Sequence, residues 1–223
     1  MSVSHRFVII TAVFVTCLIT ANIIAVKVIS VGFIILPAAI IIFPLSYVFG
    51  DILTEVYGYR VARRVIWLGF TCNLIAVIAI WLGGLLPPAP EWEHQTAYET
   101  ILGYAPRLLV ASFAAYLIGE FANSFVLAKM KIATSGRWLW TRTIGSTIVG
   151  QGLDSAVFIS IAFAGTLSFG LIGTTILTHW LVKTGYEAVA TPFTYAIVNY
   201  LKKKEGIDTY DYDTRFNPLR VSD

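Results

Sequence analysis

The stretch from Phe7 to Val26, FVIITAVFVTCLITANIIAV, contains no charged side chain over 20 residues. As a helix it would be about 30 Å long, because each residue adds about 1.5 Å, and this matches the hydrocarbon core of a bilayer. The segment has no clear small-x-small cleavage site, which distinguishes it from a signal peptide. It therefore predicts a first membrane-spanning helix.

The composition of the whole chain agrees with this prediction. Of the 223 residues, 57% are hydrophobic and 13% are charged, whereas soluble domains contain about 25% charged residues. Five further apolar stretches follow the first, so we expect an all-α integral membrane protein with six transmembrane helices in one domain. The predicted spans are residues 7–26, 33–53, 65–86, 108–128, 143–164 and 171–200, followed by a short cytoplasmic tail over residues 201–223.

Positive charges gather in three segments outside the predicted spans. These segments are residues 54–64, residues 129–142 and the run Lys202–Lys204. With six crossings all three fall on one side, and the positive-inside rule makes that side cytoplasmic. The loop over residues 87–106, on the opposite side, contains three glutamates and no Lys or Arg. We therefore expect both termini in the cytoplasm.

Several classes of function find no support in the sequence. Cys17 and Cys72 lie in apolar stretches, and the three histidines are scattered, so no metal site is indicated. There is no nucleophile elbow, no phosphate-binding glycine-rich loop and no clustered basic face. We therefore predict no enzymatic activity, no cofactor and no nucleic-acid partner.

Polar residues inside the predicted spans are the candidates for function, because a charge at the bilayer centre costs about 2.5–3.5 kcal/mol. They recur at intervals of three and four, which places each set on one helix face. The fourth and fifth spans share a pattern, GExxNS at 119–124 and GQxxDS at 150–155. If these faces converge, they form a polar pocket near the middle of the membrane. The candidate binding residues are Asp51, Glu55, Glu120, Asn123, Gln151, Asp154, Ser155, Lys183 and Glu187.

Structural roles are the alternative for several of these residues. Asn123 and Ser155 could hold neighbouring helices together, and Lys183 could pair with Glu187 one turn later in the same helix. A carboxylate such as Glu120, by contrast, is costly at this depth unless it is used.

The acidic residues at the inner end of the second predicted span also have a functional and a structural interpretation. Asp51 and Glu55 could bind a ligand, or they could pair with the arginines at positions 60, 63 and 64 in an interfacial turn. Pro44, which precedes them, could kink or break this span.

Three blocks of sequence resemble a known family. They are YVFGDILTEVYGY at 47–59, GEFANSFVLAKMK at 119–131 and RTIGSTIVGQGLDSAVF at 142–158. In these blocks the chain resembles the queuosine-precursor transporter family, also described as vitamin-uptake-transporter-like. The resemblance implies uptake of 7-cyano-7-deazaguanine across a bacterial inner membrane, with the aminomethyl derivative as a second candidate. It also implies a six-helix fold similar to the substrate-binding components of energy-coupling-factor transporters.

The implied substrate suits the polar residues chemically. A guanine-like edge presents adjacent N–H donors, which a carboxylate accepts in a bidentate manner, and amides can serve its carbonyl and ring nitrogens. We assign the first role to Glu120 or Asp154 and the second to Asn123 or Gln151. An aromatic ring from Tyr47, Tyr57 or Trp67 could stack on the base.

The leading hypothesis is a carrier that works alone or as a homodimer. One alternative is a substrate-capture subunit that needs a separate ATP-driven module, because the chain has no ATPase motif. The small residues Ala21 and Ala25 offer a face on which such a module could dock. Another alternative is a non-transporting scaffold or an intramembrane enzyme. The energy source stays open, because Glu120 or Asp154 could exchange a proton, and intracellular trapping could also draw the substrate inward.

Overall fold

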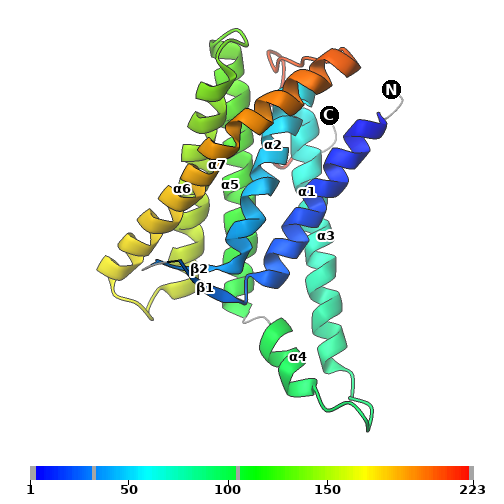
Figure 1. Ribbon diagram of the computed structural model, residues 1–223, viewed down its shortest axis with the longest axis vertical. Helices are drawn as coiled ribbons and strands as arrows, with labels where there is room; N and C mark the ends of the chain where they lie inside the picture. Colours follow the sequence, from blue (N-terminus) through cyan, green and yellow to red (C-terminus); the bar gives the residue numbers. More distant parts are fainter. Residues whose placement is uncertain (1–3, 32–33, 104–105, 221–223) are drawn as a thin grey trace.

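The protein is described by a computed structural model that covers residues 4–31, 34–103 and 106–220. The chain is predominantly helical, as predicted, with one small β-hairpin in addition (Figure 1). The elements are α1 (His5–Ile24), β1 (Val28–Val31), β2 (Ile34–Pro37), the 3-10 turn η1 (Ala38–Ile41), α2 (Phe43–Tyr57), α3 (Tyr59–Leu85), α4 (Gln95–Leu102), α5 (Pro106–Ala133), α6 (Leu139–Phe163) and α7 (Phe169–Glu205).

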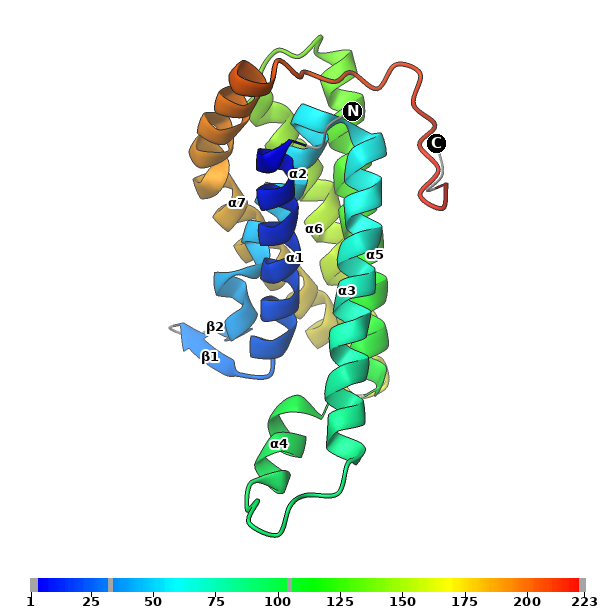
Figure 2. The ribbon, with the colours of Figure 1, turned by 90° about the vertical axis from the view of Figure 1, so that its right-hand side faces the viewer.

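Helix α2 lies at the centre of the bundle. It packs against α1, α3, α5 and α7, while α5 and α6 form a closely packed pair and α7 crosses α6 (Figures 1 and 2). Every residue from Gly50 to Tyr59 is buried. The polar residues of α2 are therefore enclosed by protein and do not face lipid.

Within the described residues, four helical stretches are long and apolar enough to cross a membrane: α1, α3, the stretch that contains α5, and α6. Helix α2 has 15 residues, which is about 22 Å and too short to span the hydrocarbon core alone. Helix α7 has 37 residues but includes charged side chains in its apolar part. The chain is thus a multi-pass membrane protein, and six crossings stay a prediction.

The second predicted span is not one continuous helix, so the boundaries 33–53 were wrong. Strand β2 pairs with β1 in antiparallel register, with Val28 opposite Pro37, and α2 begins only at Phe43. The β-branched residues of this stretch favour an extended backbone. Pro44 lies in the first turn of α2, where a helix needs no N–H from it, so it begins the helix and does not kink it.

The three basic segments share one end of the molecule. The α2–α3 junction, the α5–α6 turn and the end of α7 lie together, and the hairpin, α4 and the α6–α7 turn lie at the opposite end (Figure 1). We call these the basic end and the hairpin end. The prediction that the basic segments lie on one side agrees with this arrangement.

The tail after α7 packs against the basic end and is not merely a solvated extension (Figure 2). Thr209 donates its N–H to the Val56 carbonyl at 3.2 Å, and Asp211 accepts the Tyr59 N–H at 2.9 Å. The guanidinium of Arg63 donates to two tail carbonyls. The tail therefore ties together the ends of α2 and α3, where Gly58 turns the chain with a φ of 85°.

Candidate functional site

Buried polar side chains from four helices meet in the middle of the bundle. Asn123 donates to Asp51 at 2.6 Å, and Glu187 interacts electrostatically with Asp51 and with Glu120. The hydroxyl of Tyr47 also interacts electrostatically with Glu120 and Glu187. We call this the central polar cluster; its members, each at most 1% exposed, are Tyr47 and Asp51 of α2, Glu120 and Asn123 of α5, Gln151 of α6 and Glu187 of α7.

Many polar atoms of the central polar cluster have no hydrogen-bond partner among the described residues. Both carboxylate oxygens of Glu120 and of Glu187 are unpaired, and so are both amide atoms of Gln151. One oxygen of Asp51, the Asn123 carbonyl and the Tyr47 hydroxyl are unpaired as well. Most buried polar groups in proteins are hydrogen-bonded. Their concentration in one place makes this cluster the candidate ligand-binding site.

Glycines allow the helices to bring these side chains together. A Cβ atom on Gly119 would lie 2.8 Å from the Cβ of Asp154, and one on Gly150 would lie 2.6 Å from the Cβ of Asn123. These glycines begin the two matching blocks of the fourth and fifth predicted spans, so the predicted convergence of the blocks agrees with the structure. A Cβ on Gly50 would lie 2.9 Å from Oε2 of Glu120, so this glycine of α2 leaves room for the carboxylate.

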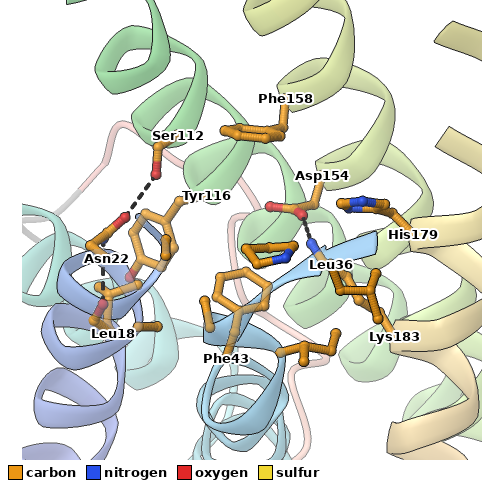
Figure 3. Close-up of a pocket in the computed structure, with 15 residues that line it drawn as sticks. Leu18, Asn22, Leu36, Phe43, Ser112, Tyr116, Asp154, Phe158, His179 and Lys183 are labelled. Carbon is orange, nitrogen blue, oxygen red and sulfur yellow. Dashed lines mark hydrogen bonds and ion pairs between the residues drawn. The ribbon is translucent and has the colours of Figure 1, made fainter. Parts of the chain in front are cut away.

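An ion pair between α6 and α7, shown in Figure 3, lies close to the cluster, because its carboxylate, Asp154, interacts electrostatically with Tyr47 and Glu120. Lys183 donates to Asp154 at 2.5 Å, and its Nζ lies 4.4 Å from the centre of the Phe43 ring. The predicted alternative that Lys183 pairs with Glu187 within α7 is therefore wrong. The Lys183 ammonium pairs with Asp154 of α6. Glu187 therefore has no lysine or arginine partner among the described residues.

Two adjoining cavities lie nearby, and the ion pair lines the smaller of them. The smaller one encloses about 100 Å³ and is lined by Asp154 and Lys183 together with Asn22, Phe158 and His179 (Figure 3). The larger one encloses about 610 Å³ and shares the last three residues with it. Both cavities are largely apolar with a few polar groups, and neither is lined by a residue of the central polar cluster.

The small residues Ala21 of α1 and Ala25, which directly follows this helix, also line the smaller cavity. Ala21 is 2% exposed. This face was expected to be free for docking an energising module. Because it faces the interior of the protein, the structure does not support docking there.

The other buried carboxylate of α2 is in a different environment. Oε2 of Glu55 accepts from Arg142 at 2.8 Å, and Oε1 accepts from Arg142 at 2.7 Å and from Lys202 at 2.6 Å. Lys131 lies 3.6 Å from the same Oε1. Glu55 thus pairs with α5, α6 and α7, and the prediction that it pairs with the arginines at 60, 63 and 64 is wrong.

Asp208 of the tail completes this group, which we call the basic-end network: Glu55, Lys131, Arg142, Lys202 and Asp208. Asp208 accepts from Lys131 at 2.5 Å and lies 2.8 Å from Lys202. Burial alone would raise the pKa of Asp208, but the hydrogen bonds from the two lysines lower it below its usual value. Glu55 lies one helical turn after Asp51 in α2, so the network adjoins the central polar cluster at the basic end.

The remaining candidates lie at the edges of the cluster or outside it. Ser155 is buried with an unpaired hydroxyl, one residue after Asp154. Trp67 instead donates its indole N–H to the Pro218 carbonyl of the tail, and Tyr57 donates to Glu205.

Reasoning from sequence missed some residues at both sites. Thr147, one helical turn before Gln151, is buried with an unpaired hydroxyl; its spacing of four was the available signal. Lys131, Arg142 and Lys202 looked like loop charges that mark the cytoplasmic side, and only the packing of three helices revealed their shared partner.

Comparison with known proteins now adds to the geometry. A family profile described as "Putative vitamin uptake transporter" matches residues 37–197. The chain belongs to this vitamin uptake transporter family. Its members are transporters, so the chain is a transport protein and not an enzyme. The segment matched by the family includes the whole central polar cluster, as well as Glu55 and Arg142, and ends before Lys202.

Relatives with more specific names are also similar to the chain. It is 32% identical over 157 residues to the probable queuosine precursor transporter of Bacillus subtilis (strain 168), a match that covers 70% of this chain and 68% of that protein. It is 27% identical over 121 residues to the queuosine precursor transporter of Escherichia coli (strain K12), which covers 54% of this chain and 52% of the relative. No solved structure matches the chain.

Proposed function

We propose that this protein takes up a 7-deazaguanine precursor of queuosine, with 7-cyano-7-deazaguanine as the first candidate, across a bacterial inner membrane. The central polar cluster would bind the substrate, and the basic end would face the cytoplasm. The observation that supports this most is the set of unpaired buried polar atoms from four helices. The names of the relatives supply the substrate class.

The cluster offers the chemistry that a guanine-like edge requires. Glu120 has two free carboxylate oxygens, which can accept the adjacent N–H groups of such a base. Asp154, the other carboxylate considered for this role, is held by Lys183, so Glu120 is the better candidate. Asn123 and Gln151 can serve the carbonyl and ring nitrogens, and Tyr47 is the predicted aromatic ring that lies inside the cluster.

The two cavities suggest the route. The larger cavity, at about 610 Å³, is within the range of about 300–1,000 Å³ typical of small-molecule sites. The smaller one, at about 100 Å³, is below it and is lined by the Asp154–Lys183 pair, so we expect this pair to move when a bicyclic base passes. In the proposed cycle the basic-end network would separate the cluster from the cytoplasm. This arrangement suits alternating access, in which one end opens while the other is closed.

Binding of 7-cyano-7-deazaguanine to the detergent-purified protein tests the proposal. We expect saturable binding by the wild type and clearly weaker binding by Glu120→Gln, with a smaller effect in Asp154→Asn. Glu99→Gln, the same change on the exposed helix α4, is the matched control and should bind as the wild type does. A folded wild-type protein that does not bind the base would remove the substrate assignment.

Reconstitution of the purified chain alone in liposomes separates a carrier from a capture subunit. Uptake of the base by these liposomes supports a carrier. Binding without uptake would instead support the alternative of a subunit that needs a separate ATP-driven module.

A further inference from the structure

The larger of the two cavities has the features of a binding site of its own. It encloses about 610 Å³ and is lined by residues of α1, α3, α5, α6 and α7, together with Val28 and Pro37 of the hairpin. This volume suits a small organic molecule. A molecule held there would lie at the hairpin end, outside the central polar cluster, because the cavity and the cluster share no residue.

Asn73 of α3 is a buried polar side chain in the wall of this cavity. It is 4% exposed, and its amide has no hydrogen-bond partner among the described residues. Most buried polar groups in proteins are hydrogen-bonded. An amide carries two N–H donors and a carbonyl acceptor. Because Asn73 lines the cavity, these groups are available to a molecule inside it.

The other polar side chains of the wall differ in how free they are. The Ser112 hydroxyl donates to Oδ1 of Asn22 at 3.0 Å, so these two groups satisfy each other (Figure 3). The Thr175 hydroxyl donates to a carbonyl of its own helix at 2.8 Å. The imidazole of His179 lines both cavities and has no hydrogen-bond partner in the described part of the chain. Asn73 and His179 are therefore the groups that remain for a ligand.

Phe158 of α6 adds a flat apolar surface to the same cavity. Its ring lines both cavities (Figure 3). Phe113, in the same wall, is already in edge contact with Phe70, at 5.0 Å between ring centres, whereas Phe158 has no aromatic neighbour among the described residues. A planar heterocycle can stack on such a ring. The acyl chain of a lipid would fill the volume but leave the Asn73 amide unsatisfied.

We propose that this cavity is a second binding site for the planar base, an entry site of Asn73, Phe158 and His179 that holds the base before it reaches the central polar cluster. This inference rests on the proposed function. The Asn73 amide donates to and accepts from the amide edge of the base, while the ring of Phe158 stacks on it.

The entry site should bind the base more weakly than the cluster does. Asn73 offers neutral hydrogen bonds, whereas the Glu120 carboxylate offers charge-assisted ones, which are roughly twice as strong. A weak first site and a tighter second one fit passage of the base from the hairpin end to the middle of the bundle.

Equilibrium binding of labelled 7-cyano-7-deazaguanine to the detergent-purified full-length protein tests the entry site. We expect two saturable components in the wild type, because the two sites share no residue and can be filled together. Asn73→Leu keeps the size of the side chain but removes its polar atoms. It should raise the Kd of the weaker component about tenfold and leave the tighter one unchanged. Asn199→Leu, the same change at an exposed position of α7, is the matched control and should keep both components.

Glu120→Gln should give the opposite pattern, with weaker binding at the cluster and an unchanged entry site. This contrast separates binding by Asn73 from a structural role. If Asn73→Leu changes both components together, Asn73 acts through the fold and the entry site is overturned.

The remaining outcomes are distinct from those that test the proposed function. A wild type that binds no base removes the substrate assignment and the entry site with it. A single component in the wild type, or a weaker component that Asn73→Leu leaves unchanged, overturns the entry site alone. If Asn73→Leu does not fold, Phe158→Leu replaces it in the same measurement, with Phe193→Leu at an exposed position of α7 as its control.

Discussion

Glu55 and Glu120 are both fully buried glutamates, yet their surroundings are opposite. Glu55 is held by one arginine and two lysines from three helices, whereas neither oxygen of Glu120 has a partner in the described structure. Removing one member of a buried ion network leaves charges uncompensated. Removing a carboxylate that has no partner leaves no other charge uncompensated. The first region should therefore determine stability, and the second should determine binding.

The largest expected effect is that of Glu55→Gln on stability. The substitution leaves Arg142 and Lys202 without their carboxylate, so we expect a loss of about 3–5 kcal/mol in the free energy of unfolding. Denaturant unfolding in detergent measures it. Glu120→Gln is the matched comparison and should be at least as stable as the wild type. Equal destabilisation by both variants would show that the two carboxylates do not differ in the way described.

Glu120→Gln should instead weaken substrate binding. A hydrogen bond to a charged group contributes about 1.5–3 kcal/mol, so we expect Kd to rise by about 10- to 100-fold. Titration calorimetry with the purified protein measures this change. Glu120→Asp, which keeps the charge but shortens the side chain, should retain part of the affinity. Unchanged Kd in Glu120→Gln would remove this residue from the binding site.

Gly50→Ala tests the comparison from α2, the helix that faces the Glu120 carboxylate. The new methyl group would lie 2.9 Å from the Glu120 carboxylate, and overpacking of this kind costs about 1–3 kcal/mol. We expect weaker binding of the base with helix content retained, as measured by titration and circular dichroism. Gly173→Ala is the control, because a Cβ there meets no atom within 4 Å.

The smallest effect concerns the pH dependence of the basic-end network. The pKa of Asp208 is lowered in the folded state, so this residue stabilises the fold above its ordinary pKa of 3.8, and that contribution is lost as the pH falls through the lower folded value. Asp208→Asn should flatten the dependence of Tm on pH in this acid range. Asp213→Asn, an exposed change in the same tail, should leave the dependence as it is in the wild type.

The matching blocks at 119–124 and 150–155 illustrate what could be predicted at the site. Spacings of three and four placed Glu120, Asn123 and Gln151 on inward faces, because helix geometry alone determines which residues share a face. The partners of Lys183 and Glu55 could not be predicted in this way. Each side chain had plausible partners nearby in sequence, and the actual partners come from helices that are distant in sequence.

The hairpin shows a similar limit for the fold. Residues 28–42 are as apolar as a membrane span, so hydropathy could not separate a strand pair and a turn from the start of a helix. Pro37 and Pro44 were the available signals of a break in the helix. A proline, however, is compatible with both a kink and a helix start.

The sequence by itself determined that this chain is a helical membrane protein with polar faces inside it, because hydropathy and helical period are local properties. Its blocks of motif also indicated the transporter family. Only the tertiary structure decided which buried charges are neutralised and which are left without a partner, because an ion pair depends on atoms about 3 Å apart that arrive from different helices and from the tail. That difference separates the basic-end network from the central polar cluster.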